Sequence, residues 1–300
     1  MSVLEKVKEL REATGAGMQD CKNALKENDN DIDKSVEYLR KKGILKASKK
    51  SSRDAAEGLI IIGENEDNFT LTEINTETDF VAKNNEFIEF CSKISKVSLN
   101  AKSLDELQNQ KLNDSKVQDS IVDLVSKIGE NIRLRRFENI DKNNQKISYY
   151  IHNKSSDLTG KIVAVVKYKS IKDESKSFAN NICMHIAAMS PMALNEKSLD
   201  KNFLQSEQKI IEEQLSKEGK KPEIIKKIIT GKLNKVISEN TLLGQSWVVD
   251  QDITVKKAIE NFNKNNSDNF EIISYYKYKV GEGIEIKKTD FSEEVKSLTK

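Results

Sequence analysis

The chain has 300 residues with a formal net charge of +2, and 37% of its residues are hydrophobic while 33% are charged. This length allows two or three compact units with cores of their own, and so small a net charge gives no strong attraction to nucleic acid or to a membrane surface. No apolar run approaches the roughly 18 residues of a membrane span, which argues against an integral membrane protein.

The beginning of the chain and its cysteines predict a cytoplasmic protein. Residues 1–8 are charged and amphipathic, without the apolar stretch of a secretion signal. Cys21, Cys91 and Cys183 are widely spaced and odd in number, as expected for reduced thiols that serve as small apolar residues.

Residues 1–43 are expected to form three short helices in a small helical domain. Apolar residues recur at the spacing of one helix face, and Gly15 and Gly17 separate the first helix from the second. Asp31 is placed to cap the third helix at its start, and Gly43 is placed to end it. The apolar residues of the three faces are Val3, Val7 and Leu10, then Met18, Cys21, Ala24 and Leu25, then Ile32, Val36 and Leu39.

Residues 44–57 are predicted to be a basic connector. Serine and alanine residues separate its four cations, which are Lys46, Lys49, Lys50 and Arg53. With this composition we expect a mobile or loosely helical link between the helical domain and the next unit.

Residues 58–140 are predicted to form the first core subdomain. Residues 59–62 and 69–75 are strand-like and flank a polar run, a pattern typical of a β-hairpin. A helix is expected next, with the apolar residues Phe87, Phe90, Cys91 and Ile94 at helical spacing. Another helix covers residues 116–128, and residues 132–137 alternate like a strand.

Residues 141–200 are predicted to form a second core subdomain, because two strand-like runs again precede a helix. Leu71 and Phe87 are 16 positions apart, and so are Ile162 and Phe178. We interpret this as a weak internal repeat of two subdomains, each a small antiparallel sheet with helices on one face.

Residues 201–243 change to a purely helical pattern. Gly219 followed by Pro222 marks the end of one helix and the start of the next, which predicts an antiparallel helical hairpin, a short coiled coil. Residues 244–300 are expected to complete the core and to add a small C-terminal module with a strand at 270–280. The predicted fold class is therefore α+β.

Few residues suggest enzymatic chemistry. No glycine-rich segment matches a phosphate-binding or dinucleotide-binding loop. His185 lies in an apolar helix, where we interpret it as a hydrogen-bonded core residue, and Cys183 would point to a different face of that helix. No catalytic residue, metal ligand or cofactor is therefore predicted.

Two basic segments keep an RNA- or ribosome-binding translation accessory protein as the alternative function. Residues 46–53 and 133–136 are rich in lysine and arginine. Acidic residues surround both segments, and no aromatic residues alternate with the cations as on a base-stacking surface. This alternative predicts an affinity for nucleic acid that falls steeply with salt.

Residues 78–84, Thr-Asp-Phe-Val-Ala-Lys-Asn, place an acid beside a large aromatic residue between a strand-like run and a helix-like run. Such turns are surface positions on which functional side chains are often mounted. The residues alone leave a structural alternative open, in which Phe80 packs back onto its own helix and Asp79 caps that helix.

Three stretches resemble the bacterial elongation factor Ts family, and they occur in the family's order. They are residues 10–25 (LREATGAGMQDCKNAL), 73–84 (EINTETDFVAKN) and 184–188 (MHIAA). Weaker similarity occurs at residues 127–132 (KIGENI) and 280–284 (VGEGI). The motifs span essentially the whole chain, which makes a chance match a poor explanation.

The resemblance implies an architecture and a function. The architecture is a ubiquitin-associated-type domain at residues 1–43, a two-subdomain dimerization core with the helical hairpin inserted, and the C-terminal module. The function is guanine nucleotide exchange in translation elongation, with elongation factor Tu as the GTPase partner and without enzymatic activity or a cofactor. Self-association through the core or the hairpin fits the family, whereas direct contact with nucleic acid or a membrane is not expected.

The resemblance also assigns contact residues in three regions. A turn intrudes beside the partner's nucleotide site and disturbs its magnesium and phosphate contacts; the matching residues are Thr78, Asp79, Phe80 and Val81. The N-terminal domain grips a separate helix of the GTPase domain, and the matching residues are Lys8, Arg11, Met18, Gln19 and Lys22. The third set is His152, Val248 and Val249. For Asp79, two roles are open: holding the turn, or repelling phosphate charge.

Overall fold

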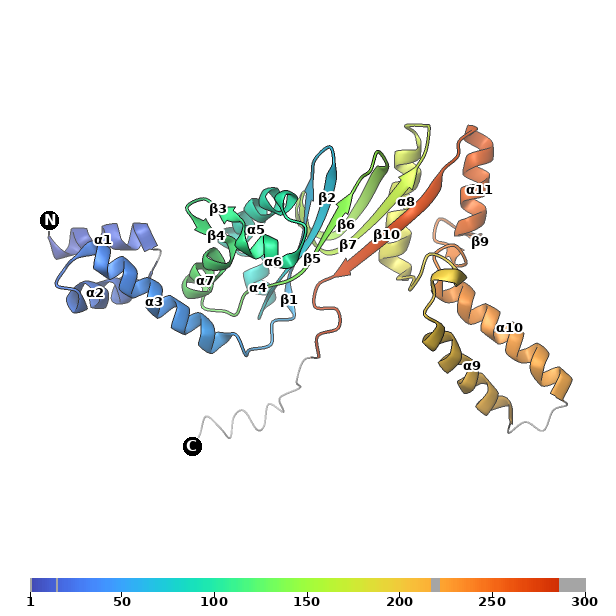
Figure 1. Cartoon of the computed structure of the whole chain (residues 1–300), viewed down its shortest axis with the longest axis horizontal. Helices are drawn as coiled ribbons and strands as arrows, with labels where there is room; N and C mark the ends of the chain where they lie inside the picture. Colours follow the sequence, from blue (N-terminus) through green and yellow to red (C-terminus); the bar gives the residue numbers. More distant parts are fainter. Residues whose placement is uncertain (1, 15, 217–221, 286–300) are drawn as a thin grey trace. The chain divides into compact units, whose positions relative to one another are not determined.

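The computed structural model describes residues 2–14, 16–216 and 222–285 (Figure 1). The chain divides into two compact units. Unit 1 comprises Met1–Asp141, Asn153–Lys161 and Tyr278–Lys300, and unit 2 comprises Lys142–His152 and Ile162–Lys277. Helices and antiparallel strands occur together in the chain, which confirms the predicted α+β class.

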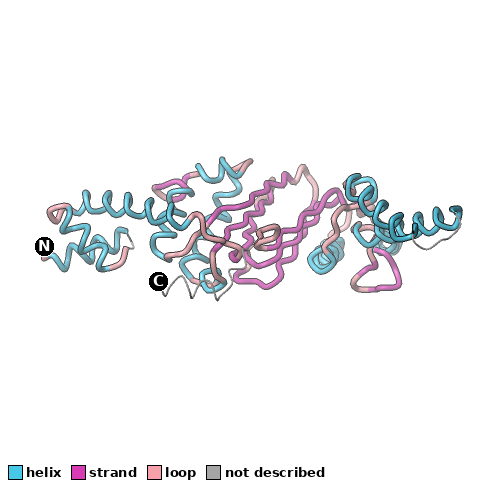
Figure 2. Tube along the Cα trace, turned by 90° about the horizontal axis from the view of Figure 1, so that it is seen from below, coloured by secondary structure: helices cyan, strands magenta, loops and turns pink. Residues whose placement is uncertain are grey.

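Unit 1 begins with a three-helix module made of α1 (Val3–Thr14), α2 (Met18–Glu27) and α3 (Ile32–Lys50); Figure 2 shows these as helices and loops. As predicted, the side chain of Asp31 caps α3 by accepting a hydrogen bond from the Lys34 backbone N at 3.0 Å. The buried apolar residues that hold the module together are Val7, Leu10, Cys21, Ala24, Leu25 and Leu39.

The predicted end of the third helix at Gly43 is wrong, because α3 continues through Gly43 to Lys50. Gly43 is buried against α7 (Val117–Ile128), and a Cβ at this position would lie 2.7 Å from the Ser126 Oγ. The glycine therefore permits a close approach of two helices. One turn further on, Ala47 packs against the core of unit 1 and stabilises the extension.

The sheet of unit 1 is built on the predicted hairpin. Strands β1 (Glu57–Glu64) and β2 (Asn68–Thr76) pair in antiparallel register, and β5 (Arg133–Asp141) pairs with the other edge of β2. At the edge of β1 that faces away from β2, Ile60 and Ile61 pair with Gly160 and Thr159.

Helices cover one face of this sheet (Figure 1). They are α4 (Asp79–Ala82), α5 (Asn85–Val97), α6 (Leu104–Asn109) and α7, with a short 3₁₀ turn at Ser98–Asn100 and a two-residue hairpin of β3 (Lys111–Leu112) and β4 (Ser115–Lys116). The predicted inward residues Phe87, Phe90 and Ile94 of α5 pack against Leu59, Ile61 and Ile74 of the strands. The helix-on-sheet arrangement of the first subdomain follows from these contacts.

A bulge in β5 brings two arginines to one carboxylate. The register between β2 and β5 shifts at Glu73, which pairs with Arg136 while Ile74 pairs with Leu134. Residues on a regular strand alternate between faces, but the extra residue at the bulge lets both Arg135 and Arg136 reach Glu73.

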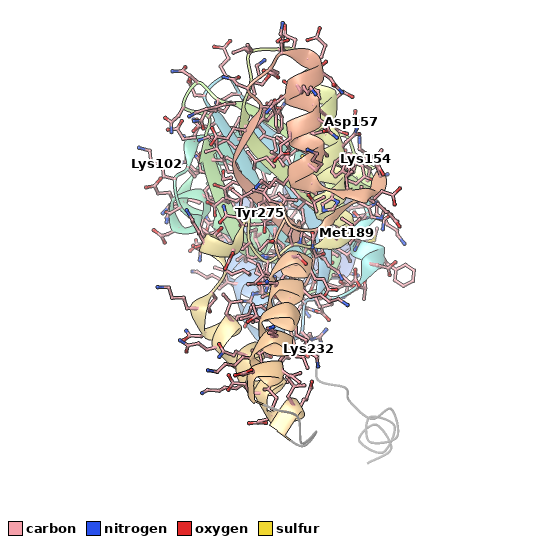
Figure 3. The ribbon with its side chains drawn as sticks, turned by 90° about the vertical axis from the view of Figure 1, so that its right-hand side faces the viewer. Lys102, Lys154, Asp157, Met189, Lys232 and Tyr275 are labelled. Atoms are coloured by element: carbon pink, nitrogen blue, oxygen red, sulfur yellow. The ribbon has the colours of Figure 1, made fainter. Side chains whose placement is uncertain are left out.

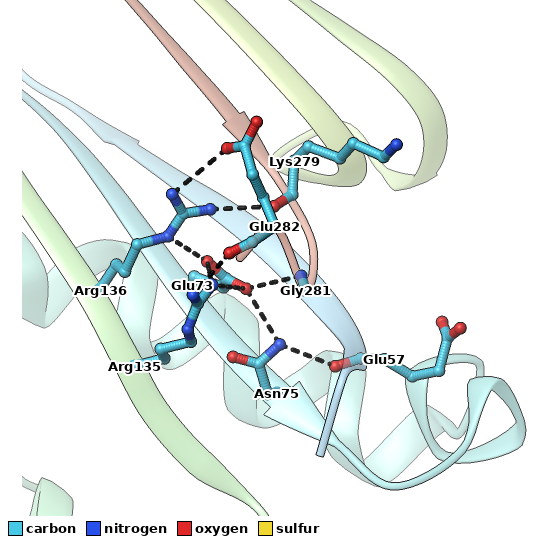
Figure 4. Close-up of polar contacts among 8 residues, drawn as sticks. All are labelled: Glu57, Glu73, Asn75, Arg135, Arg136, Lys279, Gly281 and Glu282. Carbon is cyan, nitrogen blue, oxygen red and sulfur yellow. Dashed lines mark hydrogen bonds and ion pairs between the residues drawn. The ribbon is translucent and has the colours of Figure 1, made fainter. Parts of the chain in front are cut away.

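The Glu73 side chain is fully buried, and its carboxylate is surrounded by donors (Figure 4). Arg135 donates to both of its oxygens at 3.1 Å, and Arg136 forms a second ion pair with it. Asn75 Nδ2 donates at 3.0 Å and the backbone N of Gly281 at 2.9 Å. The cluster therefore ties the chain near Gly281 to the middle of the sheet.

Unit 2 contains most of β6 (Lys146–Ser156), β7 (Thr159–Lys169) and β10 (Glu271–Lys279), and β7 pairs with both of the others. Its apolar core lies between β7 and β10 on one side and helices α8 (Ser175–Met189) and α11 (Val255–Asn266) on the other. A short strand pair, β8 (Ser246–Trp247) and β9 (Asp250–Thr254), adds Trp247 to this core. Phe178 of α8 stacks on Phe262 of α11, with ring centroids 4.3 Å apart. A 3₁₀ turn at Glu196–Ser198 follows α8.

Helices α9 (Lys201–Ser216) and α10 (Pro222–Asn240) contact each other as the predicted helical hairpin. Pro222 begins α10 as expected, and Gly219 lies outside the described residues. Charged residues such as Lys232 are exposed on α10 (Figure 3). Among all the helices in the described part of the chain, none is long and apolar enough to cross a membrane.

Candidate functional site

The turn around Phe80 exposes one aromatic side chain on a segment that is otherwise anchored. Strand β2 ends at Thr76, α4 forms a single helical turn, and Asn84 caps α5 by accepting hydrogen bonds from two backbone N–H groups. Val81 and Ala82 are buried in the core of unit 1, whereas Phe80 is 79% exposed. The alternative in which Phe80 packs back onto its own helix is therefore wrong.

Asp79 does not cap the helix. Thr78 is the N-cap residue of α4, without a side-chain cap hydrogen bond, and the Asp79 carboxylate instead accepts from Lys83 Nζ at 2.7 Å. This hydrogen bond and the charge of Lys83 lower the pKa of Asp79 below its ordinary value. Asp79 is thus an ionised carboxylate beside Phe80, which keeps its predicted role in charge repulsion open and removes the capping role.

Two carboxylates hold the base of this turn. Glu130 accepts hydrogen bonds from the backbone N of Thr78 at 3.0 Å and from its Oγ1 at 2.6 Å. Glu77 accepts a hydrogen bond from the backbone N of Asn131 at 2.6 Å, and it forms an ion pair with Arg53 at 3.3 Å. The weak motif at residues 127–132 includes Glu130, but the sequence alone predicts no role for this residue.

The five residues predicted to contact the partner in the N-terminal module are all exposed on α1 and α2. They are Lys8, Arg11, Met18, Gln19 and Lys22. Met18 was also placed on the apolar stripe of the second helix, yet Cys21, Ala24 and Leu25 alone of that stripe are buried. Met18 is therefore free to contact another molecule.

The remaining predicted contacts lie in unit 2 and are exposed. His152 is on β6, where its Nδ1 lies 3.2 Å from the Tyr150 hydroxyl. Val248 and Val249 lie between β8 and β9. Because Thr78, Asp79, Phe80 and Val81 belong to unit 1, the predicted contact residues are divided between the two units.

His185 supports the segment that carries Val248. It is fully buried, as expected for a core histidine, and its Nδ1 accepts a hydrogen bond from the Val248 backbone N at 3.3 Å. Its Nε2 lies 3.0 Å from Gln245 Oε1, and its ring stacks on Trp247 with centroids 5.3 Å apart. Burial lowers the pKa of His185, only partly opposed by Gln245, so the imidazole is neutral with its proton on Nε2.

Unit 2 is expected to lose stability as the pH falls below about 6.5, the ordinary pKa of histidine. The unfolded chain takes up a proton at His185 before the folded chain does, so unfolding becomes more favourable as the pH decreases. The fluorescence of Trp247, the single tryptophan, measures this as a lower urea midpoint at about pH 5.5 than at about pH 7.5. His185→Gln should reduce the pH dependence; an equal slope in the wild type and in this variant contradicts the assignment.

The cysteines of the chain are buried core residues. Cys91 and Cys183 are fully buried, and desolvation raises the pKa of both thiols, which makes them unreactive. Within residues 2–14, 16–216 and 222–285, no group of three or more His, Cys, Asp or Glu side chains could hold a metal ion. What the candidate residues offer is contact area, hydrogen bonds and charge.

Comparison with known proteins matches these features to one family. The family model described as Elongation factor TS matches residues 77–282. Elongation factor Ts of Clostridium acetobutylicum is 41% identical over 297 residues, which are 96% of this chain and 95% of the relative. Elongation factor Ts of Nitratiruptor sp. is 41% identical over 303 residues, which are 98% of each chain. That of Ruegeria sp. is 38% identical over 289 residues, with 96% of each chain covered.

The fold and the site define an α+β protein with a three-helix N-terminal module and with candidate functional side chains on its surface. The family match includes the Phe80 turn, and the relatives extend it over almost the whole chain. The chain belongs to the elongation factor Ts family, and its role is that of a translation elongation factor. The family resemblance drawn from the sequence motifs is thereby confirmed.

Proposed function

We propose that this chain is a guanine nucleotide exchange factor that binds elongation factor Tu carrying GDP and accelerates release of the GDP. The observation that carries the proposal is the exposed Phe80 ring on a turn whose neighbours Val81 and Ala82 are buried. A large apolar ring held away from its own core can enter a partner without disturbing the fold that carries it. Insertion beside the nucleotide site would displace the magnesium and phosphate contacts, so that GDP leaves and GTP can bind.

Exchange requires a coupling free energy between the two binding events. If the chain lowers the partner's affinity for GDP, GDP lowers the partner's affinity for the chain by the same factor. A thousandfold effect needs about 4 kcal/mol, whereas burying one phenylalanine supplies about 1.5–3 kcal/mol. Phe80 therefore needs other contacts that favour the distorted partner, because equal binding to both states shifts nothing.

The other predicted contacts are suited to this holding role. The exposed α1–α2 surface carries cations and an apolar side chain, Arg11 and Met18 among them. Arginine and exposed apolar side chains are frequent anchors of protein interfaces. In unit 2, Val248 and Val249 are exposed beside a backbone that His185 supports. These regions, together with Asp79 as a fixed negative charge, would hold the partner while Phe80 intrudes. We propose that this happens in the cytoplasm.

The RNA-binding alternative loses part of its basis, because four of its cations form ion pairs with carboxylates of the chain. Lys46 pairs with Asp20 at 3.0 Å. Arg53 pairs with Glu77 at 3.3 Å. Arg135 and Arg136 are committed to Glu73. Cations that already neutralise carboxylates contribute less to binding phosphates.

Release of a fluorescent GDP analogue from elongation factor Tu, followed by stopped flow over a range of concentrations of the chain, tests the proposal. Acceleration that saturates with concentration supports it, since the chain then acts by forming a complex. Release at the spontaneous rate at every concentration overturns it. A salt-sensitive complex with RNA in place of exchange would favour the alternative.

Arg11→Ala and Met18→Ala are each expected to raise the concentration of chain that gives half-maximal exchange by about tenfold. The maximal rate should change by less than about twofold, because contacts away from the nucleotide act on complex formation. The same stopped-flow titration measures both quantities. Lys26→Ala replaces an exposed cation of α2 outside the predicted set and should change neither. A loss of maximal rate at unchanged half-maximal concentration would contradict the anchoring role.

A further inference from the structure

We infer that Glu130 and Glu77 are positioning residues that fix the Phe80 turn in the free protein, so that Phe80 is already presented before the partner binds. The inference rests on the proposed function, and it assigns a role to the motif at residues 127–132. Neither carboxylate is among the predicted contact residues. Both would act through the turn that they hold.

Glu130 binds Thr78, the N-cap residue of α4. Its two carboxylate oxygens accept from two different groups of Thr78, the backbone N at 3.0 Å and the side-chain Oγ1 at 2.6 Å. One bond fixes the backbone and the other fixes the side-chain rotamer. Thr78 is the N-cap of α4 and lies two positions before Phe80, so this contact sets the direction in which α4 leaves the strand.

Glu77 makes the reciprocal contact. It precedes Thr78 and accepts from the backbone N of Asn131, which follows Glu130, at 2.6 Å. Residues 77–78 and residues 130–131 thus each contribute one carboxylate that binds the other segment. Two such contacts restrict both sliding and rotation of one segment relative to the other. Hydrogen bonds to ionised carboxylates are stronger than those between neutral groups. The pair therefore acts as a double brace between residues 77–78 and 130–131.

The connector is tied to the same junction. Arg53 pairs with Glu77 at 3.3 Å, and the backbone O of Arg53 accepts from Asn131 Nδ2 at 2.7 Å. Lys50, the last residue of α3, donates to the backbone O of Gly129. Gly129 is the C-cap of α7 and has a φ of +87°, the left-handed conformation that favours glycine. The chain therefore turns immediately before Glu130.

A brace is needed here because α4 is too short to hold itself. Four residues form only one helical turn, and so short a helix is unstable without tertiary contacts. The buried side chains of Val81 and Ala82 anchor one side of α4. The hydrogen bonds from Thr78 to Glu130 anchor its N-terminal end. A turn fixed beforehand does not have to be ordered on binding, which leaves more of the contact energy for the complex.

Glu130→Ala is expected to loosen the turn, and Glu130→Gln is its matched control. Glutamine has nearly the same volume, and its oxygen can accept from the Thr78 backbone while its amide donates to the Thr78 hydroxyl. In the free chain, hydrogen exchange of the Thr78 amide should become about tenfold faster in the alanine variant and stay near wild type in the glutamine variant. The maximal rate of GDP release should fall by about three- to tenfold in the alanine variant alone.

A double variant shows whether Glu130 works through Phe80. Glu130→Ala added to Phe80→Ala should cause no further loss of maximal rate, because the aromatic ring that the turn positions is already missing. Three results overturn the inference: unchanged hydrogen exchange at Thr78, unchanged maximal rate despite faster exchange, or the same rate loss with and without Phe80. If Phe80→Ala itself has no effect, the proposed function fails, while hydrogen exchange still decides whether Glu130 orders the turn. Thermal unfolding followed by circular dichroism checks that both Glu130 variants are folded.

Discussion

Phe80→Ala is expected to lower the maximal rate of GDP release from elongation factor Tu by about 10- to 100-fold, because moving a phenylalanine ring from water into apolar contact is worth about 1.5–3 kcal/mol. The ring is 79% exposed in the free chain, so it contributes little to the chain's own stability. Stopped-flow release at saturating chain measures the rate, and the thermal unfolding midpoint should stay the same.

The expected pattern differs from simple loss of binding. The complex should persist, because the α1–α2 surface and the unit 2 contacts are intact in this variant. Ile171→Ala is the matched control, since it truncates an exposed apolar side chain of unit 2 outside the predicted contact set; it should leave the maximal rate unchanged. If Phe80→Ala abolishes complex formation, or leaves the maximal rate unchanged, Phe80 is not the residue that disturbs the nucleotide site.

Much of the fold was predictable because it depends on repeated local patterns. The strand-like runs at residues 59–62 and 69–75, which flank a polar run, predict a hairpin, and β1 and β2 form it. The helical spacing of Phe87, Phe90 and Ile94 predicts a buried face, and all three are buried. These patterns recur over many residues, so one exception does not change the prediction.

The errors have a common physical cause, which is that tertiary contacts decide them. Gly43 was expected to end a helix, but packing against Ser126 makes it an interior residue of α3. The strand predicted at residues 132–137 is confirmed by β5, but a bulge interrupts its alternation and turns Arg135 toward Glu73. Neither Ser126 nor Glu73 is near in sequence, so no local pattern carries the information.

The candidate site was predictable only to the level of the turn. The motif identified Phe80 and Asp79, while their exposure and the Asp79–Lys83 ion pair required the structure. The partnership of Glu130 with Thr78 joins residues from two distant motifs. A single sequence contains no signal for that pairing beyond the two motifs themselves.

The largest effect on stability is expected from Glu73→Ala, which should lower the free energy of unfolding of unit 1 by about 3–5 kcal/mol. Glu73 is fully buried, and its removal leaves the mostly buried side chains of Arg135 and Arg136 without the carboxylate that they share (Figure 4). Urea unfolding followed by hydrogen exchange of the β2 peptides measures the loss. The backbone N of Gly281, which donates to Glu73 at 2.9 Å, should also lose its protection.

Burial, not the length of the ion pair, is what makes this effect large, and Glu37→Ala is the matched control. Glu37 forms a close ion pair with Lys41, at 2.7 Å, but both of these side chains are exposed. Water and salt screen such a pair, so its loss should leave the free energy of unfolding nearly unchanged. Equal losses in the two variants would mean that burial is not the cause. If Glu73→Ala lowers the free energy of unfolding only slightly, Arg135 and Arg136 must turn outward to water in this variant. The backbone N of Gly281 would then keep its protection only if another acceptor replaced the carboxylate.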